Sequence, residues 1–110
     1  MMNFNEYQEK AWETAICPRK GKNISYPALG LGGETGEVLD KIKIIFRDEN
    51  EIIIEEKKED IANEMGDVLW YLAALSKELN INLNDIAEKN ISKLSSRKER
   101  GVLNGSGDKR

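Results

Sequence analysis

The 110-residue chain contains no histidine and only one cysteine, Cys17. Without histidine it cannot build a Ser-His-Asp triad, a histidine-bound zinc site or a Glu-x-x-His di-iron bundle. A single cysteine forms no internal disulfide, which fits a reducing compartment, and here it has no histidine as a partner for thiol catalysis. Any metal chemistry must therefore use oxygen ligands.

Long apolar runs and a strong excess of positive charge are also missing. The apolar runs are only a few residues long, and residues 1–6 have neither a basic start nor an apolar signal core. We therefore expect a cytoplasmic protein with no membrane partner. The net charge of −3 is opposite to the basic balance of most nucleic-acid binders, so no nucleic-acid partner is expected.

The length suits one domain, residues 1–110, with a single core. The hydrophobic fraction of 39% and the charged fraction of 34% are typical of a helical protein with much exposed surface. Charge is unevenly distributed, because residues 93–110 carry six basic and two acidic side chains. Within this basic end, residues 101–110 form a glycine-rich tail.

Apolar spacing and punctuation predict four helices: residues 5–17, residues 27 to 46 or 47, residues 55–79, and a fourth that begins with Asn82 or Asn84 as cap and ends by residue 100. The isoleucine-rich stretch 48–54 is interpreted as a connection that packs as an extended strip or covers one end of the helices. Glycine 101 is the expected stop of the fourth helix. The sequence therefore predicts an all-α fold, a four-helix bundle.

Four glycines interrupt the second predicted helix, at positions 30, 32, 33 and 36. Each costs roughly 1 kcal/mol relative to alanine in a helix interior. Gly30 and Gly33 fall on or near the face that carries the glutamates of this helix. We expect them to allow close backbone approach by another helix or by a ligand.

Two acidic pairs share one spacing: Glu34 with Glu37, and Glu64 with Asp67 thirty residues later. At about 100° of rotation per residue, each pair lies on the shoulder of the apolar stripe of its helix. If the helices pack through these stripes, the pairs meet at the edge of the core. The alternative is an ordinary solvated helix face, which is the usual role of any single acidic pair.

Four carboxylates brought together would repel one another and raise one another's pKa unless a cation neutralised them. Oxygen ligands without thiol or imidazole favour Mg²⁺, with Mn²⁺ as an alternative. Such a site commonly binds substrate phosphates. Because no histidine is present, one carboxylate must act as general base, and Glu37, at the outer edge of the shoulder, is the candidate.

A basic partner is predicted on the fourth helix, where Asn90, Lys93 and Arg97 share one narrow stripe. Cations four residues apart beside a core-facing strip are placed to reach phosphates held by the metal. They could instead be surface charges bonded to carboxylates or water. The tail could be frayed, or Gly105–Gly107 could offer backbone N–H groups to an anion.

Two neighbouring aromatic residues lie near the second acidic pair. Tyr71, on the acidic shoulder, is a weak candidate for contact with a nucleoside and could instead pack at the bundle edge. Trp70 lies opposite the apolar stripe of its helix. We interpret it as a second packing face or a subunit contact in preference to a base-stacking platform.

The acidic and basic motifs occur in an order that resembles MazG-like, all-α nucleotide pyrophosphohydrolases. The similar segments are Glu34-Thr35-Gly36-Glu37, Glu64-Met65-Gly66-Asp67-Val68-Leu69-Trp70-Tyr71, Asn90-Ile91-Ser92-Lys93-Leu94-Ser95-Ser96-Arg97, and the ending from Arg100 to Asp108 with Arg110. Many relatives have consecutive lysines where this chain has Lys43-Ile44, which leaves the role of Lys43 open.

The resemblance implies a homodimer or homotetramer that binds Mg²⁺ and cleaves nucleoside triphosphates between the α and β phosphates, as in nucleotide-pool house-cleaning. It implies metal binding by Glu34, Glu37, Glu64 and Asp67, and nucleotide or phosphate contact by Asn90, Lys93 and Arg97. It does not select a base. Two alternatives stay open: a phosphoribosyl-ATP pyrophosphohydrolase, which shares the fold and acidic motif, and a non-enzymatic helical interaction module.

Overall fold

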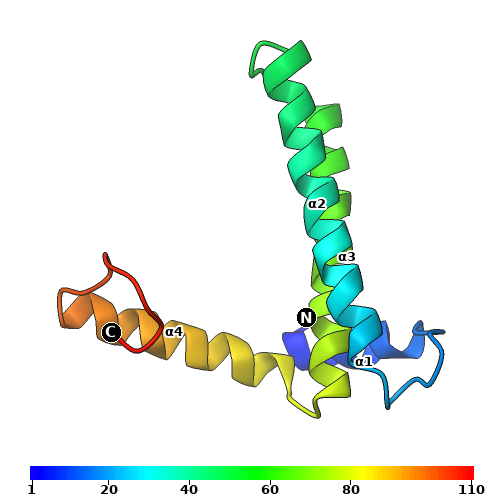
Figure 1. Ribbon diagram of the computed structural model, residues 1–110, viewed down its shortest axis with the longest axis vertical. Coiled ribbons are helices and arrows are strands. Elements are labelled where there is room, and N and C mark those ends of the chain that lie inside the picture. The colour runs from blue at the N-terminus through cyan, green and yellow to red at the C-terminus, as the bar shows by residue number, and fades with distance from the viewer.

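The computed structural model describes residues 1–110 and consists of four helices without strands (Figure 1). Their bounds are α1 Phe4–Glu13, α2 Ser25–Asp48, α3 Glu55–Glu78 and α4 Leu83–Glu99. The all-α class and the four helices are confirmed. No helix combines the length and the apolar character that crossing a membrane would require.

The helix ends differ from the expected ones where side chains and loops intervene. Helix α1 stops at Glu13, four residues early, and the hydroxyl of the C-cap residue Thr14 donates to the carbonyl of Ala11 at 2.7 Å. Between α2 and α3, Asn50 and Glu51 adopt positive φ angles of 52° and 63°, which reverse the chain. The stretch 48–54 is thus a connection, as expected.

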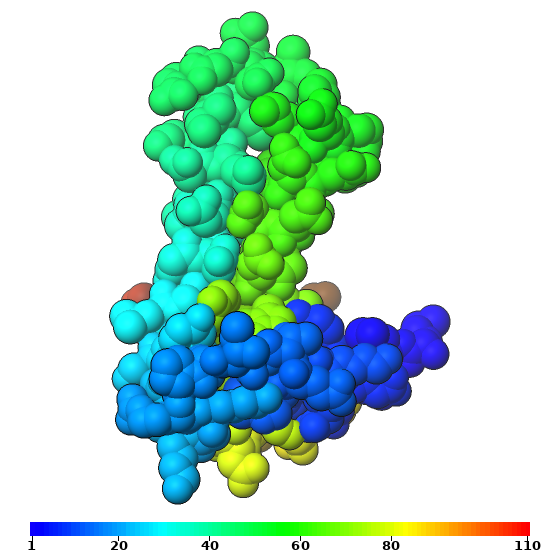
Figure 2. Space-filling view, turned by 90° about the vertical axis from the view of Figure 1, so that its right-hand side faces the viewer, coloured from blue at the N-terminus to red at the C-terminus, as the bar shows by residue number.

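The helices do not close into a four-helix bundle within one chain, and that prediction needs correction. Helices α2 and α3 lie side by side as a hairpin, while α1 crosses its base (Figure 2). Helix α4 leaves the base and projects away from the hairpin, so that it contacts α1 and α3 but not α2. Helical periodicity predicts which face of a helix is apolar, not the direction in which the helix leaves a turn.

Gln8 helps to fix the direction of α4. Its side chain is only 3% exposed, its Nε2 donates to the carbonyl of Ile81 at 2.9 Å, and its Oε1 accepts from the N–H of Leu83 at 3.0 Å. The N-cap residue Asn82 makes no side-chain cap hydrogen bond. Gln8 therefore satisfies one of the free N–H groups at the start of α4 and ties α1 to the α3–α4 turn.

The core is small and lies where α1, α3 and the start of α4 meet. Ala11, Ala73 and Leu83 form its buried centre, and Tyr7, Leu69 and Trp70 pack against it. Only 11 of the 110 residues are buried, and large apolar side chains such as Leu39, Phe46 and Met65 are more than half exposed. One chain therefore leaves much of the apolar stripes of α2 and α3 uncovered.

The C-terminus of α4 ends in the hydrogen-bonding pattern of a Schellman motif. Gly101 has φ of 70°, the N–H of Val102 bonds to the carbonyl of Arg97 at 2.8 Å, and the N–H of Gly101 bonds to that of Lys98 at 3.2 Å. The expected stop at Gly101 is confirmed. The motif turns residues 102–110 back along α4 (Figure 1).

Candidate metal and substrate site

Three of the four predicted metal ligands meet between α2 and α3. One carboxylate oxygen from each of Glu34, Glu64 and Asp67 lies within 4.8 Å of the others. Glu34 comes from α2 and the other two come from α3, so the packing of the hairpin brings them together. We call Glu34, Glu64 and Asp67 the acidic cluster.

Glu37, the fourth predicted ligand and the candidate base, is not part of the acidic cluster. It lies on α2 three residues after Glu34 and its side chain is exposed. Its negative charge nevertheless contributes to the raised pKa of Glu34. The structure therefore places Glu37 beside the acidic cluster, on its solvent side.

Negative charge in the acidic cluster is poorly compensated. Desolvation raises the pKa of Glu34, and the charges of Asp67, Glu64 and Glu37 raise it further. No ion pair reaches Glu34 or Asp67, and the ammonium of Lys41 lies 3.8 Å from Oε1 of Glu64. Carboxylate oxygens with this unbalanced charge suit a hard divalent cation such as Mg²⁺ or Mn²⁺.

An aromatic cavity of about 350 Å³ adjoins the acidic cluster. This volume is within the range of small-molecule sites. It is lined by Thr14, Glu34, Asp67, Trp70 and Tyr71. The rings of Trp70 and Tyr71 meet edge to face with centroids 4.9 Å apart.

Thr14 holds Trp70 in place at this cavity. The indole N–H of Trp70 donates to the hydroxyl of Thr14 at 2.8 Å, and that hydroxyl donates to the carbonyl of Ala11. Trp70 thus packs on α1, which agrees with the expected role as a second packing face. It also lines the cavity. No sequence pattern indicated Thr14 as a site residue, because its place depends on how α1 crosses α3.

Gly30 is required by the close approach of Tyr71. A Cβ atom at Gly30 would overlap the ring of Tyr71, which confirms the expected role of this glycine. Gly33 has no atoms near its Cβ direction, so no helix of this chain approaches it and only approach by a ligand stays a prediction for that residue. Burial, then interaction with Tyr26 and the charges of Glu34 and Asp67, raise the pKa of Tyr71.

The structure does not bring the predicted basic residues to the acidic cluster. Asn90, Lys93 and Arg97 lie on α4, which makes no contact with α2. The prediction assumed that the bundle closes within one chain. In the observed fold, these three side chains of the same chain do not reach a triphosphate at the acidic cluster.

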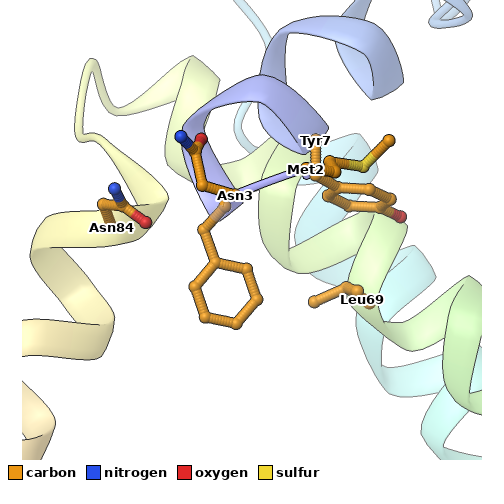
Figure 3. A pocket seen from close by; sticks show the side chains of 6 residues that line it. Met2, Asn3, Tyr7, Leu69 and Asn84 are labelled. Atoms are coloured by element: carbon orange, nitrogen blue, oxygen red, sulfur yellow. The ribbon is translucent and has the colours of Figure 1, made fainter.

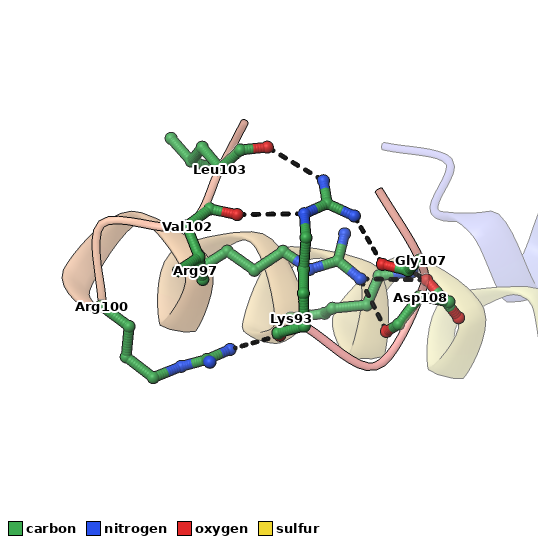
Figure 4. Close-up of polar contacts among 8 residues, drawn as sticks. Lys93, Arg97, Arg100, Val102, Leu103, Gly107 and Asp108 are labelled. Atoms are coloured by element: carbon green, nitrogen blue, oxygen red, sulfur yellow. Dashed lines mark hydrogen bonds and ion pairs between the residues drawn. The ribbon is translucent and has the colours of Figure 1, made fainter. Parts of the chain in front are cut away.

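Lys93 and Arg97 instead bind the C-terminal tail (Figure 4). The Lys93 ammonium lies 2.7 Å from Oδ1 of Asp108, and Nη2 of Arg97 donates to the same oxygen at 3.0 Å and to the Asp108 carbonyl at 2.7 Å. These hydrogen bonds lower the pKa of Asp108. Within one chain, Lys93 and Arg97 therefore pair with a carboxylate, as the alternative interpretation expected. The tail supplies that carboxylate.

Arg110 folds the tail on itself, while Asp108 ties it to α4, so the tail is not frayed. The guanidinium of Arg110 donates to the carbonyls of Val102 at 3.0 Å, Leu103 at 2.9 Å and Gly107 at 2.6 Å. Arg97 lies beneath the tail, 6% exposed, and its Nε has no acceptor. The basic stripe and the tail thus form one unit.

A second cavity, of about 400 Å³, lies between α1, α3 and the start of α4 (Figure 3). It is lined by Met2, Asn3, Phe4, Tyr7, Leu69 and Asn84. Burial and then the charge of Asp67 raise the pKa of Tyr7, so this residue is within electrostatic reach of the acidic cluster. The cavity itself contains no acidic side chain.

Comparison with known proteins adds a family assignment. A family model described as the MazG nucleotide pyrophosphohydrolase domain matches residues 26–102, well over half of the chain. The gene 37 protein of Mycobacterium phage L5 is 43% identical over 114 aligned residues, which cover 99% of this chain and 100% of that protein. No solved structure matches the chain.

Proposed function

Because the chain belongs to the MazG nucleotide pyrophosphohydrolase family, we propose that it hydrolyses nucleoside or deoxynucleoside triphosphates to the monophosphate and pyrophosphate. The observation that carries this proposal is the acidic cluster, whose carboxylate oxygens lie within 4.8 Å of one another beside an aromatic cavity. The family match supports the reaction class. The geometry supports the place where the reaction occurs, and nucleotide-pool house-cleaning is the proposed role.

Glu34, Glu64 and Asp67 would hold the divalent cation, Mg²⁺ or Mn²⁺, with Glu37 as a further ligand or as the base. When bound, the cation neutralises phosphate charge and lowers the pKa of water. Glu37 is exposed beside the acidic cluster, which leaves its carboxylate free to accept a proton from the attacking water. Glu37→Gln should lower turnover about 100-fold while Mg²⁺ still binds, and unchanged turnover would reject the base role.

The nucleoside is proposed to occupy the aromatic cavity, with Tyr71 against it. The cavity shares Glu34 and Asp67 with the acidic cluster, so a nucleoside there would have its α-phosphate at the carboxylates. Thr14 fixes the indole of Trp70, which gives the cavity one rigid wall. This arrangement supports a nucleotide ligand without selecting its base.

A homodimer or homotetramer is part of the proposal. An apolar groove of about 470 Å³ runs along α2 and α3, lined by Thr35, Val38, Met65, Gly66, Val68, Leu69 and Leu72. Exposed apolar faces of this kind mark protein contacts. A second copy could also bring Asn90, Lys93 and Arg97 to the acidic cluster. Sedimentation that shows a stable monomer at micromolar concentration would contradict this assembly.

The reaction is tested by a panel of ribonucleoside and deoxynucleoside triphosphates, together with phosphoribosyl-ATP, assayed with Mg²⁺ for pyrophosphate and for orthophosphate. We expect pyrophosphate as the product and no release without a divalent cation. Release confined to phosphoribosyl-ATP would replace the proposed substrate class. No release from any compound would support the non-enzymatic helical module.

A further inference from the structure

The two ends of the acidic cluster differ in chemistry along the hairpin. Toward the base of the hairpin, α3 presents Trp70 and Tyr71 at the aromatic cavity. Toward the α2–α3 connection, it presents Asp60 and Lys57. At 1.5 Å per residue, Tyr71 and Lys57 are about 20 Å apart along the helix.

Lys41 lies on the side of the acidic cluster that faces the α2–α3 connection. It follows Glu34 by seven residues, so both side chains share one face of α2 and are about 10 Å apart along its axis. Its ammonium is 3.8 Å from Oε1 of Glu64, and its side chain is 36% exposed. An ion pair this loose and this exposed contributes little free energy, so a ligand can replace it at small cost.

A small hollow of about 70 Å³ adjoins Lys41 on the side toward the α2–α3 connection. It is lined by Lys41, Ile44, Ile45, Lys57, Asp60 and Ile61. Its lining contains two ammonium groups and one carboxylate, and Glu64 lies within ion-pair distance of the Lys41 ammonium. Lys57 is also loosely held, with its ammonium 3.9 Å from Oε1 of Glu49.

We propose that Lys41 binds the β- and γ-phosphates of the substrate, so that the triphosphate lies along the hairpin with its nucleoside at Trp70 and Tyr71. This assignment rests on the proposed hydrolase function. It gives one chain a cation at the acidic cluster, where Lys93 and Arg97 are absent because α4 projects away. A lysine ammonium is well suited to phosphate as a point charge.

Lys41 then stabilises the leaving group. The oxygen of water bonds to the α-phosphorus, and its proton passes to Glu37. The bond from the α-phosphorus to the bridging oxygen breaks, and its electron pair stays on pyrophosphate. The negative charge that develops there faces the ammonium of Lys41, which is the direction in which stabilisation accelerates phosphoryl transfer.

The test compares Lys41→Met with Lys43→Met. Lys43 is on the same helix, 64% exposed, and its ammonium lies 2.6 Å from Asp40, so its loss changes net charge equally without touching the acidic cluster. Calorimetric titration with Mg²⁺-pyrophosphate and with a nucleoside monophosphate measures the two parts of the substrate separately. We expect Lys41→Met to weaken pyrophosphate binding about tenfold and to leave monophosphate binding unchanged.

Lys43→Met should bind both compounds as the wild type does, and Lys41→Arg should recover most of the pyrophosphate affinity. Equal weakening for both compounds would mean that Lys41 acts through Glu64 and the metal, which overturns the assignment. Unchanged pyrophosphate binding in Lys41→Met, or none in the wild type, also overturns it. Intact pyrophosphate binding without any turnover in the substrate panel would instead count against the hydrolytic reaction.

Discussion

The acidic cluster on the hairpin and the basic stripe on α4 differ in how far their charges are satisfied. Glu34 and Asp67 have no cationic partner, and the only ion pair of Glu64 is the loose one with Lys41. Lys93 and Arg97 both bind Asp108 at 3.0 Å or less. The acidic cluster therefore has unpaired carboxylates that suit a cation, whereas Lys93 and Arg97 already bind an anionic side chain of their own chain.

The acidic cluster and the basic stripe, which consists of Asn90, Lys93 and Arg97, therefore differ in what they require to bind a ligand. The acidic cluster needs a cation, because desolvation and mutual repulsion raise the pKa of Glu34. The basic stripe does not reach the acidic cluster within one chain, since α4 and α2 do not touch. Any phosphate that binds Lys93 and Arg97 must also compete with Asp108.

The largest expected effect comes from the acidic half. Glu64→Gln keeps the size of the side chain and removes one charge of the acidic cluster. A metal supplies several kcal/mol of transition-state stabilisation, so turnover should fall at least about 100-fold. Steady-state assays at saturating Mg²⁺ measure this change. Glu59→Gln, an exposed position on α3, is the matched control and should retain wild-type turnover.

A second prediction concerns the contact between Gly30 and Tyr71. Gly30→Ala should lower the free energy of unfolding by about 1–3 kcal/mol, because the new methyl group overlaps the Tyr71 ring and must displace it. Gly33→Ala, in open space on the same helix, should raise it by up to about 1 kcal/mol. Urea denaturation measures both. Equal effects of the two substitutions would show that Tyr71 does not lie against Gly30.

The third prediction concerns pH, because Glu34 and Asp108 should change the stability of the fold in opposite directions as the pH rises. The folded-state pKa of Glu34 is raised, so ionisation of Glu34 destabilises the metal-free protein as pH rises through that pKa. The folded-state pKa of Asp108 is lowered, so its stabilisation is present above its unfolded pKa of about 3.9 and is lost as pH falls through the lower value.

Melting temperatures without metal test this contrast. Near neutral pH, Glu34→Gln should melt above the wild type, and Asp108→Asn slightly below it. The gain from Glu34→Gln should disappear at a pH low enough to protonate Glu34. Shifts of the same sign for both variants near neutral pH would show that the acidic cluster and the ion-paired Asp108 do not differ in this way.

The smallest expected effect is local release of the tail. Asp108→Asn weakens the contacts to Lys93 and Arg97, while Arg110 still holds Val102 and Leu103. Trypsin should therefore cut after Arg100 a few-fold faster, as followed by mass spectrometry, because cleavage tracks the population of the open tail. Asp85→Asn, at the start of α4, is the control. Equal cleavage of both variants would show that Asp108 does not anchor the tail.

Much of the hairpin could be predicted from the sequence, because its determinants are local. Helical periodicity placed Glu34 beside Glu64 and Asp67, and the cost of Gly30 in a helix indicated a close approach there. The place of Glu37 was harder to predict. A three-residue spacing sets two side chains near one face, but the distance between the helices decides whether both reach the same point.

The direction of α4 could not be predicted, and this explains the error about the basic stripe. It depends on Gln8, which bonds to the carbonyl of Ile81 and the N–H of Leu83, residues more than seventy positions away in the chain. The partner of Lys93 and Arg97 was missed for a similar reason. Asp108 reaches them only because Gly101 reverses the chain after α4.

Calorimetric titration of the metal-free protein with Mg²⁺ measures whether the acidic cluster binds a divalent cation. We expect saturable binding by the wild type and by Glu59→Gln, and its loss in Glu64→Gln. Bound Mg²⁺ should also stabilise the fold, by about 2.7 kcal/mol at one hundred times the dissociation constant. Absence of Mg²⁺ binding in the wild type, or equal binding by all three proteins, would show that the acidic cluster is not a metal site.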